Sequence, residues 1–296
     1  MTPWTHEFSC VLPRPPARVF AALIEPLQLE RWWAEHAEVE PRAGGAYRFW
    51  GRHTYATPDR SEARQKLTRV EPNRVVAYSW RLLGLDSMVT LELAPESAEG
   101  VEAAKLTIRH EFPRLPEGAR ADDLVDDLWR LACGNLRAHL LGLGGLLWPD
   151  YGNPRPEVRL SVLIDAPRAN VFKALIDPVW LNRWIASAAV VEPRAGGRYS
   201  YGWNYAIKGR DVQGGPTRIL ELVENERLVT DWPDWRGDPS VAPTTVAWLL
   251  MDEGTGTRVT LVHGPFARST DVSDYPFGWQ DFLAQLKAKL EDPTGD

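Results

Sequence analysis

Two histidines stand at matching places in the chain, and histidine is the side chain best suited to proton transfer near neutral pH. His110 ends the alternating run 105–110, and His263 ends the similar run 258–263. Alternate residues of a strand share one face, so both rings should point into the interior of a sheet. Two interpretations stay open. In the first, each ring is hydrogen-bonded by a backbone carbonyl or a hydroxyl and has a structural role. In the second, it contacts a ligand or transfers a proton.

Proton transfer by His110 would need a partner. The adjacent Glu111 should face away from the interior, and Gly264 stands at its place beside His263. The other histidines that could join a metal site, among them His36 and His53, have no counterpart in the second half. Ligand spacings such as HxxxH or HExxH do not occur in the sequence. We therefore predict no catalytic residue, no metal and no cofactor.

Charge and composition narrow the possible partners. The formal net charge of the 296 residues is −6, without a basic block, so neither a nucleic acid nor a membrane surface is expected. Apolar runs are too short to span a bilayer, and the first residues do not resemble a signal peptide. The two cysteines, Cys10 and Cys133, form no CxxC pair, which fits a reducing compartment. These features predict a cytoplasmic protein.

The sequence contains an internal repeat. Residues 15–49 match residues 167–201 without a gap, with 21 identities in 35 positions. Later segments match at offsets between 150 and 153, and the fourteen tryptophans divide seven and seven. A period near 150 residues is too long for a solenoid unit. The Gly- and Pro-rich stretch 144–158 is typical of a linker. We predict two duplicated domains, 1–150 and 155–296.

Each copy predicts the same order of elements. An alternating run gives a first strand, and prolines then begin two short helices. Gly44-Gly45 and Gly196-Gly197 should allow a turn with positive φ into the sheet. Several short alternating runs predict an antiparallel meander. A long helix follows, with an apolar stripe through Trp129 or Trp279. The expected fold is α+β, a helix-grip domain in which a curved antiparallel sheet wraps a long C-terminal helix.

Several motifs resemble a known family. They are the Val-Phe-x-Ala-Leu helix, the Trp of the second helix, the Pro-x-x-Gly-Gly hairpin and the terminal Gly-Trp helix. The last motif is complete in residues 277–291 of the second copy. In the first copy Leu128 stands at the position of its glycine. The chain resembles the Bet v 1/START-like (SRPBCC) superfamily, and within it the activator of Hsp90 ATPase homologue 1-like family. The resemblance implies the helix-grip fold and a stress-response context, and it implies a function as a carrier, sensor, chaperone cofactor or, in a few cases, enzyme.

An internal cavity between sheet and long helix is the expected binding site. Its polar-tipped aromatic side chains should orient a ligand through dispersion and hydrogen bonds. The candidate residues, from both copies, are Tyr47, Phe49, Trp80, His110, Trp129, Ala132, Tyr199, Tyr201, Trp248, His263 and Trp279.

The first cavity should be the larger one. Ala132 aligns with Phe282 of the second copy, and Leu91 aligns with Trp248. Losing two aromatic side chains leaves a void unless neighbours refill it. Trp33 and Trp50 are the residues able to do so, since smaller residues stand at their places in the second copy.

Three functions are carried forward. The first is non-enzymatic binding of a small apolar or aromatic molecule. The second is a chaperone or Hsp90-type cofactor, or another protein-partner module. The third is a cyclase- or hydrolase-like enzyme that uses His110 with an ordered water.

Overall fold

The chain is described here by a computed structural model that covers residues 2–98, 100–117, 120–143, 146, 148–207 and 209–292. Contacts between Cα atoms divide it into two compact units. The first unit comprises Met1–Pro154 with Ser269–Asp274, and the second comprises Arg155–Arg268 with Tyr275–Asp296. The domain boundaries expected from the sequence, at 150 and 155, stay a prediction.

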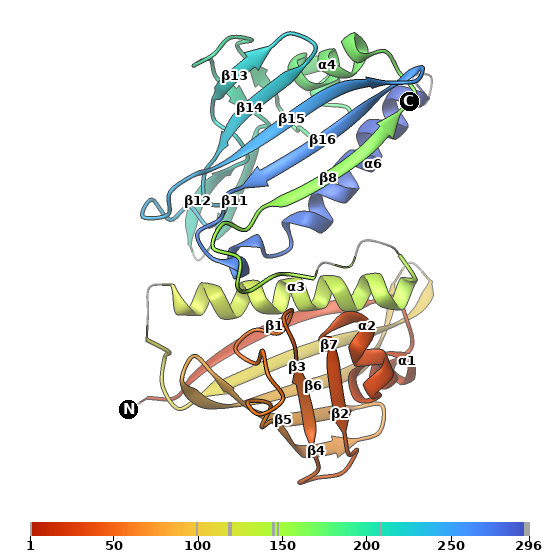
Figure 1. Ribbon diagram of the computed structural model, residues 1–296, viewed down its shortest axis with the longest axis vertical. Helices are drawn as coiled ribbons and strands as arrows, with labels where there is room; N and C mark the ends of the chain where they lie inside the picture. The colour runs from red at the N-terminus through yellow and green to blue at the C-terminus, as the bar shows by residue number, and fades with distance from the viewer. Residues whose placement is uncertain are drawn as a thin grey trace. The chain divides into compact units, whose positions relative to one another are not determined.

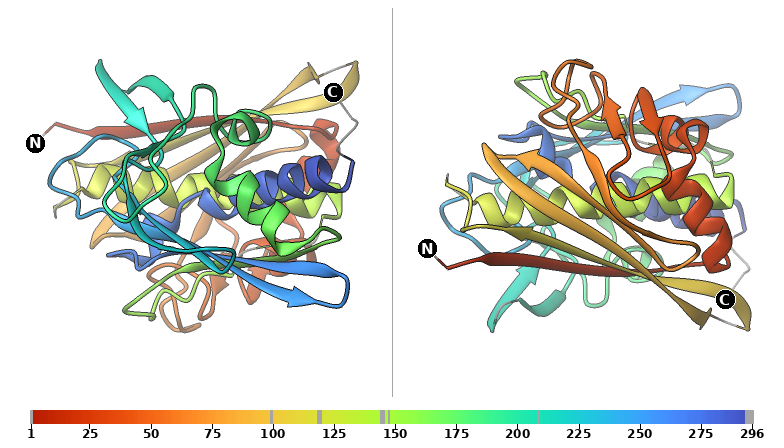
Figure 2. Two further views of the ribbon diagram at one scale, coloured as in Figure 1. Left: turned by 90° about the horizontal axis from the view of Figure 1, so that it is seen from above. Right: turned by 90° about the horizontal axis from the view of Figure 1, so that it is seen from below.

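The described part of Met1–Pro154 contains a five-stranded antiparallel sheet, a two-stranded sheet and three α-helices (Figure 1). The large sheet has the order β1-β7-β6-β5-β4. Figure 2 (right) shows the long helix α3 running across the strands of this sheet. The elements are β1 (Trp4–Leu12), α1 (Pro16–Ile24), α2 (Pro26–Trp32), β2 (His36–Val39), β3 (Tyr47–Trp50), β4 (Lys66–Glu71), β5 (Val75–Leu82), β6 (Leu85–Ala98), β7 (Val101–Phe112) and α3 (Ala121–Leu141).

The second unit repeats this plan. Its large sheet has the order β13-β14-β15-β16-β8, which is the same neighbour relation as in the first unit. The elements of the second half are β8 (Val158–Ile164), α4 (Arg168–Ile176), α5 (Pro178–Leu181), β9 (Val190–Val191), β10 (Tyr199–Ser200), β11 (Trp203–Ile207), β12 (Arg210–Gly214), β13 (Ile219–Val223), β14 (Arg227–Trp232), β15 (Thr244–Glu253), β16 (Gly256–Gly264), the 3₁₀ helix η1 (Ser269–Val272) and α6 (Tyr275–Glu291). The expected fold of two tandem helix-grip domains is confirmed.

Prolines stand at the start of the short helices, and a buried tryptophan joins the two short helices of each unit. Proline stands in the first turn of α2 and α5, where a missing N–H leaves no bond unmade. The indole of Trp32 donates to the carbonyl of Ala22 at 2.9 Å, and Trp184 donates to the carbonyl of Ala174 at 3.1 Å. Each buried tryptophan thereby fixes the angle between the two short helices of its unit.

The repeated Gly-Gly pair forms the turn of a hairpin. Gly44 and Gly196 both have φ +76°, a conformation that favours glycine. At the next position a Cβ on Gly45 would come within 2.2 Å of the Glu40 carbonyl oxygen, so that glycine is required by close backbone approach. The turn joins β2 to β3, rather than the second helix to the sheet as the sequence suggested.

Candidate functional site

His110 lies in the centre of the first unit and is fully hydrogen-bonded. Its side chain is 0 % exposed. The Nδ1 atom accepts a hydrogen bond from the indole N–H of Trp129 at 3.3 Å. Because Nδ1 accepts, the proton of a neutral ring is on Nε2, which faces the Ser87 hydroxyl at 2.8 Å. Ser87 in turn donates to the Trp80 carbonyl at 2.6 Å. One chain of hydrogen bonds thus joins α3, β7, β6 and β5.

His263 has the same surroundings in the second unit. Its Nδ1 accepts from the Trp279 indole at 3.0 Å, and its Nε2 faces the Thr244 hydroxyl at 2.8 Å. Thr244 donates to the Trp232 carbonyl at 3.3 Å. The hydroxyl partners are serine in one copy and threonine in the other, so the repeat preserves the hydrogen bonds and not the residue. Both arrangements hold the long helix to its sheet.

Burial keeps both rings neutral. Loss of hydration lowers the pKa of His110 from 6.5 to about 3, with a smaller contribution from His6. Burial alone lowers the pKa of His263 to about 3. With both nitrogens occupied and no accessible second protonation state near neutral pH, these rings act as structural connectors between helix and sheet.

These pKa values predict a loss of stability in mild acid. The unfolded chain takes up a proton at each histidine near pH 6.5, whereas the folded protein does so only near pH 3. The stabilisation is therefore complete above pH 6.5 and declines as the pH falls towards 3. Between pH 7 and 5 we expect a loss of about 2 kcal/mol for each histidine.

Urea unfolding of the full chain at pH 7 and pH 5, followed by tryptophan fluorescence, measures this loss. His110→Gln should remove about half of the histidine-linked pH dependence, and His263→Gln should remove the other half. An unchanged pH dependence in both variants would contradict the assignment.

An aromatic cluster fills the first unit beside His110. The Trp33 ring stacks on Trp129 at 5.9 Å between centroids, with an interplanar angle of 11°. The edges of Phe49 and Trp80 meet Trp33 at 5.4 and 6.0 Å. Trp33 follows the end of α2 and is half-buried. It lines a pocket together with Ala132, and the sequence marks it as a residue able to refill this interior.

A small pocket remains at this cluster. Its volume is about 20 Å³, close to the space of one water molecule. The expectation that the first interior is the larger of the two stays a prediction. Trp33 and Ala132 both line this small pocket. The lining residues are Trp32, Trp33, His53, Thr54, Tyr55, Trp80, Leu128, Leu131, Ala132, Asn135, Trp148, Pro149 and Tyr151.

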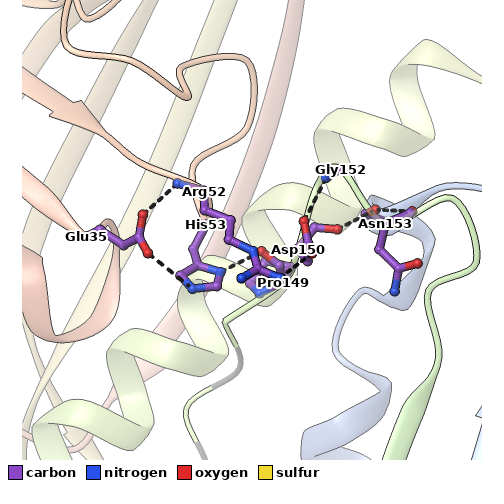
Figure 3. Close-up of polar contacts among 8 residues, drawn as sticks. Glu35, Arg52, His53, Pro149, Asp150, Gly152 and Asn153 are labelled. Atoms are coloured by element: carbon purple, nitrogen blue, oxygen red, sulfur yellow. Dashed lines mark hydrogen bonds and ion pairs between the residues drawn. The ribbon is translucent and has the colours of Figure 1, made fainter.

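Two irregular segments come together at this pocket (Figure 3). Arg52 donates to the Asp150 carboxylate at 2.6 Å, and the His53 Nδ1 lies 3.0 Å from the Pro149 carbonyl oxygen. Glu35 accepts from the Arg52 backbone N–H at 2.6 Å and lies 3.5 Å from the His53 Nε2. The bond from Arg52 lowers the pKa of Asp150. The Arg52–Asp150 ion pair is exposed, and exposed ion pairs are individually weak, so it contributes little to holding the two segments together.

Aromatic rings continue from these polar contacts into the pocket. His53 meets Trp148 at 5.4 Å, and Tyr55 meets Tyr151 edge-on at 5.3 Å. Trp148 and Tyr151 belong to the stretch expected to be a linker. That stretch therefore also forms part of the pocket wall.

The second unit fills the equivalent interior from a different element. Trp203 of β11 stacks on Phe282 at 5.5 Å, and its indole donates to the Ile185 carbonyl at 2.8 Å. Ile185 stands at the place of Trp33. In the first copy the interior is filled by Trp33, the residue after the second helix. In the second copy it is filled by Trp203 of a strand together with Phe282.

The other predicted cavity residues lie in the two cores. Tyr47 and Tyr199 donate to the carbonyls of Leu23 and Leu175, each at 2.6 Å. The remaining members Phe49, Tyr201, Trp248 and Trp279 are each at most 2 % exposed. Of the predicted set, Trp80 and Ala132 line the pocket of the first unit, and Trp129 backs it through Trp33.

Sequence reasoning missed part of the pocket wall. Thr54, Tyr55, Trp148 and Tyr151 lie in segments without regular strands or helices. Aromatic residues inside a Gly- and Pro-rich stretch were the available signal, because exposed linkers rarely carry two of them.

The described residues contain neither a cluster of metal-binding side chains nor a membrane-spanning helix. No group of three or more His, Cys, Asp or Glu side chains in these residues is arranged to hold a metal ion. None of the helices among them combines the length and apolarity needed to cross a bilayer.

Comparison with known proteins matches one family model in both halves. The model describes the activator of Hsp90 ATPase homolog 1-like proteins (AHSA1), and it matches residues 13–140 and 165–291. The search of curated proteins returned no match.

Solved structures give similar results. The AHSA1-like protein RHE_CH02687 of Rhizobium etli is 28% identical, over 48% of this chain and 89% of its own, with a TM-score of 0.37. The Aha1 dimer of Colwellia psychrerythraea is 19% identical, over 47% and 99%, with a TM-score of 0.39. DynU16, from a dynemicin biosynthetic locus, is 18% identical over 96% and 98%, with a TM-score of 0.39.

Proposed function

The chain belongs to the family of activator of Hsp90 ATPase homolog 1-like proteins, and from this premise we propose that it is a cytoplasmic, non-enzymatic protein that binds a small aromatic or apolar molecule in its first domain. The site is the aromatic pocket between the large sheet and α3. The supporting observation is that Trp33 stacks on Trp129 and lines this pocket together with the small Ala132.

In this proposal, binding replaces the Trp33 indole by the aromatic ring of the ligand. The present pocket of about 20 Å³ is too small for an organic ligand. A flat ligand enters when Trp33 turns out and the ligand ring stacks on Trp129 in its place. Because the walls are already aromatic and buried, a flat ligand can reach micromolar affinity, on the order of −8 kcal/mol.

The second domain serves stability in this proposal. Its interior contains Trp203 and Phe282, whose stacked rings stand where a ligand would bind. Trp203 is also tied by its indole N–H to the Ile185 carbonyl. Displacing it would break a hydrogen bond as well as a stacking contact, so the second interior is the harder of the two to open.

The enzymatic alternative receives no support from the geometry. Both nitrogens of His110 are hydrogen-bonded within the protein, and the low pKa keeps the ring neutral. A general base needs a free nitrogen within reach of the substrate proton.

Ala132→Phe tests the proposed site. We expect it to weaken the binding of indole to the full chain at least tenfold, because the new ring occupies the space of the ligand. Isothermal titration calorimetry measures this affinity. Ala288→Phe, the same change at an exposed position of α6, is the matched control and should leave binding unchanged. Equal affinities of the wild type and Ala132→Phe would refute the site.

A protein-binding function is the second candidate, and one surface favours it. An open groove of about 390 Å³ lies on the second unit, lined mainly by apolar side chains that include Phe172, Ile176 and Leu222. The family description names the Hsp90 ATPase, so Hsp90 is the partner to test. Retention of the wild-type chain by immobilised Hsp90, lost in Ile176→Glu, would favour this function. Absence of retention would reject it.

A further inference from the structure

Two buried polar groups of the first pocket have no hydrogen-bond partner. They are the indole N–H of Trp80 and the hydroxyl of Thr54, whose side chains are 2 % and 5 % exposed. Both residues line the pocket. Buried donors are nearly always paired in folded proteins, so an unpaired one inside a pocket calls for an explanation.

The second unit shows which hydrogen-bond acceptor the Trp80 indole lacks. Trp232 lies beside His263 at 5.3 Å, as Trp80 lies beside His110 at 5.7 Å. The indole of Trp232 donates to the hydroxyl of Tyr275 at 3.1 Å.

The first copy lacks this hydroxyl. Aligning Trp129 with Trp279, at offset 150, places Val125 where the second copy has Tyr275. Val125 is 0 % exposed and cannot accept a hydrogen bond. The first copy therefore has the indole donor of Trp80 without the protein acceptor that Trp232 has in the second copy.

We propose that the ligand of this pocket is a planar bicyclic aromatic molecule with a hydrogen-bond acceptor, a ring nitrogen or carbonyl oxygen, that receives the Trp80 N–H. The Thr54 hydroxyl supplies a second polar contact. The inference rests on the proposed function and adds the chemistry of the ligand. Its size follows from Trp33, whose own two-ring indole is the group to be replaced.

The ligand is neutral where it is buried. Among the described residues that line the pocket there is no Lys, Arg, Asp or Glu. An ionised group would lose its hydration there without gaining an opposite charge, which is strongly unfavourable. A neutral acceptor loses less and recovers the loss from Trp80.

Naphthalene and quinoline form a matched pair of probes. They have the same shape, and only quinoline carries an acceptor nitrogen, which is unprotonated at neutral pH. Titration calorimetry with the full chain should show quinoline binding about tenfold more tightly, the usual size of one well-placed buried hydrogen bond.

Trp80→Phe removes the donor and keeps an aromatic ring. We expect the preference for quinoline to disappear, and the ratio of the two affinities corrects for any general loss of packing. Trp248→Phe is the matched control, because it removes a buried unpartnered indole N–H from the second unit. It should leave the preference intact. Thr54→Val should reduce the preference by a smaller factor.

The outcomes separate this inference from the proposed function. Equal binding of both probes, unchanged by Trp80→Phe, would overturn the acceptor proposal and leave the binding function standing. It would mean that a buried water serves Trp80. Absence of binding by either probe and by indole would overturn both.

Discussion

Trp33→Ala is expected to lower the free energy of unfolding of the first domain by about 3 kcal/mol, and saturating indole is expected to restore most of it. The substitution deletes the ring that stacks on Trp129 and fills the space above Ala132. The resulting hole has the shape of an indole. Because Trp33 no longer has to be displaced, indole should bind this variant at least tenfold more tightly than the wild type. Thermal or urea unfolding with and without indole measures both effects.

Trp50→Ala is the matched control for this rescue. Trp50 was the other tryptophan able to refill the first interior, yet it stacks on His36 at 5.2 Å and lies 5.9 Å from the Arg60 guanidinium. Removing it opens no internal hole, so indole should not restore the stability lost. Rescue of both variants, or of neither, would contradict the displaced-ring account.

Trp279→Ala is expected to destabilise the second domain by about 4 kcal/mol. Trp279 is 2 % exposed, and it supplies the N–H that holds the Nδ1 of His263. The variant loses a large buried ring and leaves a buried acceptor without its donor. Urea unfolding of the full chain, with fluorescence and circular dichroism followed together, measures the loss.

Trp279→Phe separates the two contributions. It keeps one aromatic ring and removes the N–H together with the second ring of the indole, so we expect a loss of about 2 kcal/mol from the unpaired His263 nitrogen and the smaller ring. A Trp279→Phe variant as stable as the wild type would show that the hydrogen bond to His263 contributes nothing.

The fold was readable because its signals are local and occur twice. Prolines at the starts of short helices and the Gly-Gly pair have one backbone interpretation each. The strict alternation around His110 and His263 also identified the inward face. Because the same signals recur in both halves in the same order, each assignment supported the other.

The pocket was less predictable because the corresponding segments of the two copies, although equal in length, adopt different structures at its edge. Residues 51–65 form no strand, whereas the corresponding residues 203–217 contain the β11–β12 hairpin. Side chains at such positions follow no periodicity. The inward position of Trp203 and the burial of Thr54 were therefore invisible in the sequence.

Trp33 shows the limit of volume arguments. Comparing Ala132 with Phe282 predicts spare volume in the first copy, where Trp33 and Ala132 line the same small pocket. Which neighbour refills the space depends on the rotamer at the end of α2, and the sequence does not determine that angle. The loss of Tyr275 in favour of Val125 was readable by alignment, but its meaning depends on the hydrogen bond of Trp232.

One measurement tests the central claim, that the first interior is a binding site opened by Trp33. The fourteen indole N–H groups give separate ¹H–¹⁵N signals, which single Trp→Phe variants assign. Titration of the full chain with quinoline is predicted to move the Trp80 signal in the direction of stronger hydrogen bonding and to shift those of Trp33 and Trp129. The signals of Trp232 and Trp279 should stay in place. Signals of Trp33, Trp80 and Trp129 that do not change at saturating quinoline would contradict the claim.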